Sequence, residues 1–133
     1  MSRVFASLLA MLVWLLSSPG CVLAQDTVVE LLRLQVPVSQ RQVWLDAEAQ
    51  TWQPWLEQQQ GFLSRDLYWD AALEQGVLLI RWASREQWKA ISPEEVERVQ
   101  RQFDADVNTS LGRPSLSQSA FPLVAETELL PLP

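Results

Sequence analysis

The stretch Val43–Trp69, VWLDAEAQTWQPWLEQQQGFLSRDLYW, constrains the fold of this chain more than any other segment. Its first half repeats apolar residues at the spacing of an amphipathic helix. Its second half, Phe62–Trp69, has the aromatic-rich composition of a strand. Gly61 lies between the two, where a helix ends most easily in the left-handed conformation. The segment therefore predicts a helix, a glycine stop and a strand in direct succession.

A capping sequence precedes this helix. Ser39 and Gln42 have the spacing of a capping box, in which the serine accepts a bond from the third amide and the glutamine reaches back. We therefore predict a helix from Ser39 to about Gln60. Its apolar residues cover roughly 200° of the helix surface, which favours burial against more than one layer or contact with a partner. Pro54 predicts a kink or a new first turn, because it has no N–H to donate.

The remaining elements follow in a regular order. The sequence predicts strands at Thr27–Val36, Phe62–Trp69, Val77–Trp82 and Phe121–Leu130, a turn at Asp70–Gly76, capping boxes at Ser84–Gln87 and Ser92–Glu95, a helix end near Asn108, and a polar loop at Thr109–Ser119. The order β-α-β-β-α-β is that of a ferredoxin-like α+β fold. An antiparallel four-stranded sheet with strand order 4-1-3-2 would place the two most apolar strands, the first and the third, in its centre.

The last strand carries its own signals. Pro122 lacks a backbone donor, which confines this strand to a sheet edge or places the proline at the strand start. Glu126 and Glu128 alternate with smaller or apolar residues and are expected to point outward.

The two central strands carry apolar residues on both faces. The two helices can cover only one face of the sheet, and the chain has no further elements for the other. The sequence therefore predicts a homodimer in which two such sheets pack face to face.

The N-terminal residues have the pattern of an export signal. Arg3 precedes a short apolar run, Val4–Leu16, and small residues lead to an expected cut after Ala24. The run is shorter than the roughly 20 residues of a membrane-spanning helix. We predict a product exported to the periplasm, the thylakoid lumen or the medium. A lipoprotein attached through Cys21 is the alternative, although Ser18 stands where such signals carry leucine.

Removal of residues 1–24 leaves one predicted domain, 25–133, with a formal charge of −7, since Arg3 is the only charged residue lost. An acidic chain with no basic run is a poor partner for nucleic acids or anionic membranes. The chain has no histidine and its only cysteine is Cys21, so zinc and redox-metal sites lack their usual ligands. We expect neither a metal nor a cofactor.

Two motifs resemble a known family. Gly61-Phe62 after the first helix, and Arg81–Trp88 (RWASREQW) from the third strand into the next helix, resemble the dimeric α+β barrels of the antibiotic biosynthesis monooxygenase-like superfamily. Within it, the chain is similar to an uncharacterised exported cyanobacterial group. The resemblance covers roughly residues 27–108 and implies a dimeric barrel with a small-ligand site. The superfamily includes cofactor-independent monooxygenases, haem-degrading enzymes and proteins without an assigned reaction, so the fold does not fix the function.

The chain departs from the haem-degrading members. Trp82 matches their tryptophan, but Ile91 stands near the position of their iron-binding histidine, and the first strand has no asparagine. The resemblance therefore disfavours haem degradation. For a cofactor-independent reaction no catalytic base is recognisable, and Tyr68, Asp66 and Glu30 remain the candidates.

Three strands carry one arginine each. Arg33, Arg65 and Arg81 are costly in apolar strands unless they are paired or face a wet cavity. The simpler interpretation pairs them with Glu30, Asp66 or acids of a partner chain. The alternative is a cleft between sheet and helices that holds an anionic or polar-aromatic ligand. The candidate ligand-binding residues are Trp52, Trp55, Arg65, Tyr68, Arg81 and Trp82.

Two classes of function follow from these residues. In the first, the barrel binds a small apolar or aromatic molecule and would act on it as a cofactor-independent monooxygenase. In the second, it is a non-catalytic exported dimer whose aromatic surface binds another protein. A pocket bounded by tryptophans and a strand arginine favours the first, and a flat exposed tryptophan patch favours the second.

Overall fold

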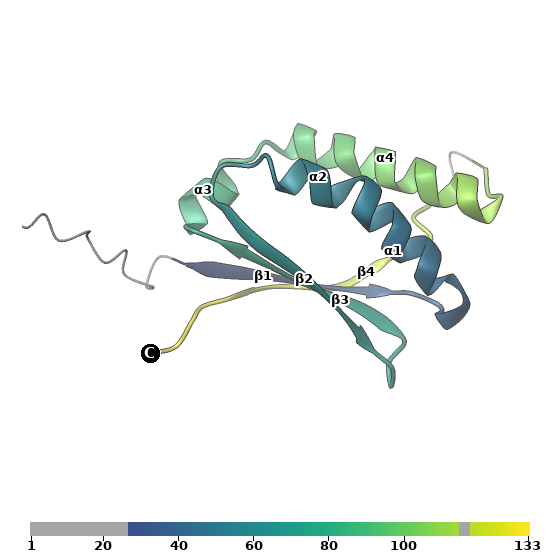
Figure 1. The fold of residues 1–133 in the computed structure, drawn as a ribbon, viewed down its shortest axis with the longest axis horizontal. Helices are drawn as coiled ribbons and strands as arrows, with labels where there is room; N and C mark the ends of the chain where they lie inside the picture. The colour runs from purple at the N-terminus through teal and green to yellow at the C-terminus, as the bar shows by residue number, and fades with distance from the viewer. Residues whose placement is uncertain (1–26, 115–117) are drawn as a thin grey trace, which may run out of the picture.

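A computed structural model describes residues 27–114 and 118–133 of the chain, so the predicted signal peptide 1–24 lies outside the described residues. Figure 1 shows a sheet with helices on one side. The elements are β1 (Val28–Gln35), η2 (Val38–Gln40), α1 (Arg41–Gln50), α2 (Trp52–Leu56), β2 (Phe62–Asp70), β3 (Gln75–Trp82), α3 (Arg85–Lys89), α4 (Pro93–Leu111) and β4 (Leu123–Leu129). The predicted ferredoxin-like α+β fold is confirmed.

The four strands form one antiparallel sheet in the order β2-β3-β1-β4, which is the predicted order. The apolar strands β1 and β3 are central, and Leu32 of β1 lies directly opposite Leu78 of β3. β4 is an edge strand that begins directly after Pro122. This position suits proline, which has no N–H to donate to a neighbouring strand.

Two groups of buried side chains hold the helices on the sheet. Trp44 of α1 and Phe103 of α4 pack with Leu78 and Phe121 in the first group. Leu56 of α2 packs with the sheet residues of the second. Truncating one such aromatic residue to alanine typically costs about 3–5 kcal/mol. These contacts fix α1, α2 and α4 over the same face, as Figure 1 shows.

The predicted single helix from Ser39 is wrong at its start. Val38–Gln40 form a short 3-10 turn, and the Ser39 side chain makes no capping bond. The Gln40 amide instead bonds the Pro37 carbonyl at 2.8 Å, so α1 begins only at Arg41.

The break predicted at Pro54 is confirmed. Pro54 has no N–H to donate to the carbonyl of Gln50, four residues earlier. The helix is interrupted at the next residue, Thr51. The Thr51 hydroxyl donates to the Ala47 carbonyl at 2.7 Å and secures the end of α1. Gly61 then adopts a φ of +87°, as expected for the stop before β2.

The later capping residues were predicted correctly. Ser84 Oγ accepts from the Gln87 amide at 3.1 Å, and Ser92 Oγ accepts from the Glu95 amide at 3.3 Å. The predicted helix end near Asn108 is wrong, and with it the start of the polar loop. α4 continues to Leu111, because Gly112 supplies the left-handed C-cap with a φ of +65°.

The β2–β3 turn is shorter than predicted. β2 extends through Asp70 and β3 starts at Gln75, so Gly76 belongs to the strand rather than to the turn. The left-handed residue in the turn is Glu74, with a φ of +52°.

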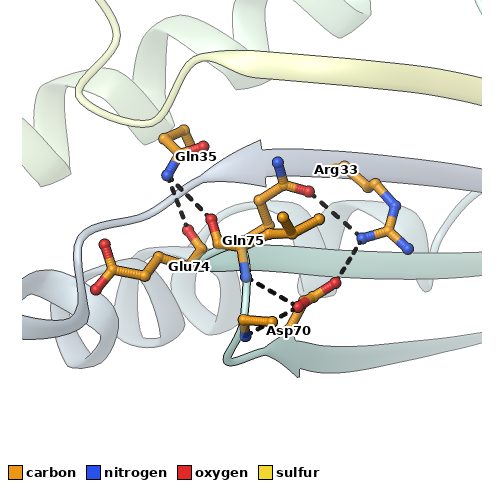
Figure 2. A network of polar contacts seen from close by, with 7 residues as sticks. Arg33, Gln35, Asp70, Glu74 and Gln75 are labelled. Atoms are coloured by element: carbon orange, nitrogen blue, oxygen red, sulfur yellow. Dashed lines mark hydrogen bonds and ion pairs between the residues drawn. The ribbon is translucent and has the colours of Figure 1, made fainter.

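A polar network ties this turn to β1, as Figure 2 shows. Asp70 accepts from the amides of Ala72 and Leu73, both at 3.1 Å, and the Leu73 bond is the main reason that the pKa of Asp70 is lowered. Arg33 Nη1 donates to Asp70 at 3.2 Å, and Gln35 Nε2 donates to the Leu73 carbonyl at 3.3 Å. The Arg33 charge is therefore paired within the chain, although with an acid that the sequence did not single out.

One face of the sheet is turned away from the helices. Residues directly opposite each other on antiparallel strands share a face. Leu31 of β1 lies opposite Leu79 of β3 on the face away from the helices, and Val29 and Val77 share that face. Within residues 27–114 and 118–133, α1, α2 and α4 all lie on the other side (Figure 1).

The prediction that Glu126 and Glu128 point outward holds for Glu126, which is exposed, whereas Glu128 is half-buried. They lie opposite Leu32 and Glu30, which belong to the face that the helices cover. The register shift of β4 between Arg33 and Leu34 of β1 could not be read from the sequence.

Gly76 has a packing role. A Cβ atom at this position would lie 2.6 Å from two ring carbons of Trp44, so only glycine lets the indole lie against β3. We predict that Gly76→Ala lowers the free energy of unfolding by about 1–3 kcal/mol, the usual cost of overpacking. Urea denaturation measures this loss. In a Trp44→Phe background the smaller ring makes room, so the loss caused by Gly76→Ala should shrink; equal losses in both backgrounds would refute the steric explanation.

Candidate functional site

A cavity of about 760 Å³ lies between the sheet and the helices. Its floor consists of helix-facing residues of β1 and β3, among them Leu32 and Ile80. Four tryptophans contribute to its lining: Trp52, Trp55, Trp82 and Trp88. This volume is within the range of small-molecule sites, whose walls are mostly apolar with a few polar groups.

Four of the six predicted ligand-binding residues meet at this cavity. Trp52 and Trp55 come from α2, Arg65 from β2, and Trp82 from the last position of β3. They converge because Pro54 and the break at Thr51 start a new helical segment over the cavity.

The other two predicted residues lie elsewhere. Tyr68 is opposite Val77, and Arg81 is opposite Val29, so both side chains belong to the face away from the helices. Successive side chains of a strand point to opposite faces, so Tyr68 and Arg81 lie on the opposite side of the sheet from the cavity residues Arg65 and Trp82. No ion pair of Arg81 is found among residues 27–114 and 118–133.

The tryptophan rings are held by edge contacts and by their own N–H groups. Trp52 and Trp55 meet at 5.7 Å between ring centroids, with planes 78° apart. Trp82 makes a similar contact with Phe62 at 6.0 Å. Trp55 Nε1 donates to Glu95 at 3.4 Å. Such edge-to-face pairs add about 0.5–1.5 kcal/mol to the burial of the rings, so the walls are ordered before any ligand arrives.

A buried ion pair between Glu48 of α1 and Arg65 of β2 lines the cavity. The two side chains are only 4% and 2% exposed. Glu48 also accepts from Trp44 Nε1 at 3.1 Å, and Arg65 Nη1 donates to Gln53 at 3.1 Å. Burial raises the pKa of Glu48 and lowers that of Arg65, while their mutual attraction opposes both shifts. The pair thus satisfies two charges that would otherwise be costly in this interior.

Glu30 is a second, half-buried acid of the cavity. It is the third residue of β1, and its Oε2 accepts from Trp82 Nε1 at 3.3 Å. Burial raises the pKa of Glu30, and Glu126 raises it further, whereas the Trp82 bond and Lys89 lower it. A carboxyl group in a cavity with a raised pKa is suited to general acid–base chemistry.

Only one of the three candidate bases is in the cavity. Asp66 and Tyr68 lie opposite Leu79 and Val77, on the face away from the helices. Glu30 is on the helix-facing side, so it is the candidate base of this site.

Sequence reasoning missed three residues of the site. Glu48 was not singled out, although it lies four residues after Trp44 and four before Trp52 on the same helical stripe. Trp88 and Lys89 come from α3, and the Lys89 ammonium lies 3.7 Å from the centroid of the Trp88 ring. The capping box before α3 places this helix next to the end of β3, but nothing in the sequence directs its side chains toward the cavity.

The charges of the lining are predominantly negative. Five acidic and two basic side chains line the cavity, a balance of −3: Glu30, Glu48, Glu97, Asp104 and Glu126 against Arg65 and Lys89. Because Glu48 already neutralises Arg65, this arginine is not free to receive an anion. The lining therefore does not favour the anionic ligand considered from the sequence.

The ion pair leads to a pH-dependent prediction. Arg65→Met leaves Glu48 buried without its partner, which typically costs about 3–5 kcal/mol at neutral pH. A lone buried carboxyl group has a higher pKa in the folded state than in the unfolded state. The variant therefore keeps its stability at pH values below the unfolded-state pKa and loses it as the pH rises through the folded-state pKa. Urea unfolding from pH 4.5 to 8 should show the deficit of Arg65→Met growing with pH. The double variant Glu48→Gln/Arg65→Met should lack this pH dependence, and a deficit independent of pH in the single variant would contradict the argument.

The chain was compared with known proteins. No protein-family model matches the sequence, and no curated protein matches it. Among solved structures, the monooxygenase ActVA-Orf6 of Streptomyces coelicolor, in complex with Nanaomycin D, is 16% identical, with a TM-score of 0.56 over 83% of this chain and 90% of its own. A protein of Shewanella loihica PV-4 assigned as a monooxygenase is 14% identical, with a TM-score of 0.52 over 81% and 96%.

A third structure carries the family description predicted from the motifs. A protein of Chloroflexus aurantiacus assigned as an antibiotic biosynthesis monooxygenase is 19% identical, with a TM-score of 0.50 over 81% of this chain and 95% of its own. At these identities the likeness concerns the fold alone. The resemblance to antibiotic biosynthesis monooxygenase-type proteins, predicted from Gly61-Phe62 and Arg81–Trp88, is confirmed at the level of fold.

Proposed function

We propose that the cavity binds a small, predominantly apolar or aromatic molecule and that the protein acts on it as a cofactor-independent monooxygenase. The observation that carries this proposal is the convergence of four tryptophans and a half-buried acid, Glu30, on one cavity. The monooxygenases that share the fold support it, and the Streptomyces coelicolor protein holds Nanaomycin D.

Glu30 would supply the proton chemistry of such a reaction. Its carboxylate can accept a proton from an acidic C–H or O–H group of a bound molecule, because burial has moved its pKa upward from the ordinary range. The Trp82 N–H holds one oxygen and leaves the carboxyl group in a fixed orientation. The tryptophan walls would shield the reacting atoms from part of the solvent.

The second function class has less support. A protein-binding dimer without catalysis was expected to expose a flat tryptophan patch. None of the tryptophans in the described part of the chain is among its exposed large apolar residues, and four of them line the cavity.

The assembly that fits the fold is a homodimer formed by the sheet face away from the helices. Leu31, Val77 and Leu79 on the central strands make this face apolar, and Leu129 of β4 extends it to the sheet edge. A second copy of the same face would cover the exposed Leu129 and the half-buried Leu31 and Leu79, whereas Val77 is already buried in the single chain.

We also propose that the mature protein works outside the cytoplasm, on the basis of the N-terminal export pattern. None of the helices described in the structure is long and apolar enough to cross a membrane.

Ligand binding can be tested through the tryptophans themselves. A panel of neutral aromatic and polyene compounds should include members that quench the fluorescence of the wild-type protein. Trp82→Phe should weaken binding of these members by about tenfold, because it shortens the wall and removes the bond to Glu30. Trp69→Phe is the matched control, since Trp69 lies outside the cavity lining and packs in the first core group. The proposal fails if no compound binds, or if both variants weaken binding equally.

The homodimer is tested separately by sedimentation. At micromolar concentration the wild-type protein should sediment as a dimer, and Leu79→Glu should convert it to a monomer by placing a charge in the apolar interface. Leu73→Glu makes the same change at an exposed position of the β2–β3 turn and should leave the dimer intact. Circular dichroism establishes that each variant is folded. A wild-type monomer would refute the sheet-on-sheet assembly.

A further inference from the structure

We infer that the cavity selects ligands that carry a cationic nitrogen on an apolar or aromatic body, with the nitrogen held by Glu30 and by a tryptophan face. This inference rests on the proposed ligand-binding function and specifies the chemical class of the ligand. Three independent observations carry it: the balance of charge, the position of Lys89, and the unused oxygen of Glu30.

The first observation is the excess of negative charge. The Glu48–Arg65 pair is neutral as a unit, so the remaining charged side chains of the lining are four acids and Lys89. Charges act more strongly across a cavity with low-dielectric walls than across bulk water. An ammonium group gains from this field, and a carboxylate or phosphate group loses.

The second observation is that the chain already holds an ammonium group at this cavity. Lys89 Nζ lies over the Trp88 ring, 3.7 Å from its centroid, and is close enough to Glu30 to lower the pKa of that acid. An alkylammonium over an aromatic face is a favourable arrangement, worth about 0.5–2 kcal/mol. Lys89 is an exposed residue at the last position of α3, so its flexible side chain can yield the ring to a ligand.

The third observation is the bonding of Glu30. Its Oε2 accepts the Trp82 N–H, and no hydrogen bond to its Oε1 is found within the described residues. A ligand N–H can therefore donate to Oε1 without displacing a bond of the protein. The apolar body would then lie along Ile80 and Leu56 toward the Trp52–Trp55 pair, all of which line the same cavity.

Three probes with the same ring system test this selection. 1-Naphthylmethylamine, 1-naphthalenemethanol and 1-naphthoate differ mainly in charge, and titration calorimetry at pH 7 gives the Kd of each. We expect the amine to bind about tenfold more tightly than the alcohol, and the carboxylate more weakly than the alcohol.

Matched variants locate the effect. Glu30→Gln should bring the Kd values of amine and alcohol to within about twofold of each other, because the amine loses its ionic partner. Glu86→Gln removes the same charge from α3 outside the cavity lining and should leave the tenfold difference in place. Lys89→Gln removes the competing ammonium and should strengthen binding of the amine several-fold. Thermal unfolding identifies any variant that is not folded.

The outcomes separate this inference from the proposed function. An alcohol that binds as tightly as the amine overturns the cation selection and leaves the ligand-binding function standing. A preference for the amine that survives Glu30→Gln, in a folded variant, also overturns the inference. Failure of all three probes to bind would count against the ligand-binding cavity itself.

Discussion

The buried pair between Glu48 and Arg65 is the interaction on which both the fold and the cavity depend. It joins α1 to the edge strand β2, and Trp44 and Gln53 add further bonds from two helices, while Arg65 Nε has no partner among the described residues. Breaking one partner leaves an uncompensated charge inside the layer between helices and sheet, which costs more than the pair itself contributes. The pair therefore fixes where the helices lie without filling the space beside it, and the cavity occupies that space.

The cavity also depends on the break between α1 and α2. A continuous helix would have carried Trp52 and Trp55 along the axis of α1, whereas Thr51 and Pro54 start a new segment above the end of β3. The two tryptophans then pack against each other. Trp52 also contacts the core group around Trp44, and both rings contact the group around Leu56 and Trp82, so the same aromatic side chains belong to the core and to the cavity wall.

The sequence predicted those features that depend on local chemistry. The strand order, the stop at Gly61 and the caps at Ser84 and Ser92 follow from residue types at fixed spacings, and the structure has all of them. Two local signals failed, the cap at Ser39 and the helix end near Asn108, and the other errors concern register and packing. Tyr68 and Arg81 were grouped with Arg65 and Trp82, although neighbouring strand residues face opposite sides of a sheet. Gly76 reads as a turn residue in the sequence, but the Trp44 ring beside it comes from a distant helix.

Strand β1 couples the two proposed properties of the protein. Glu30 and Leu32 point into the cavity, while Val29 and Leu31 lie on the face proposed to meet a second copy. Because one backbone carries both sets, a displacement of β1 at the interface would move Glu30 relative to Trp82 and change the bond that orients it. A dimer in which two such sheets brace each other would hold β1, and with it the acid of each cavity, in place. The proposed assembly and the proposed chemistry of the site would thus both depend on the alternating pattern of one central strand.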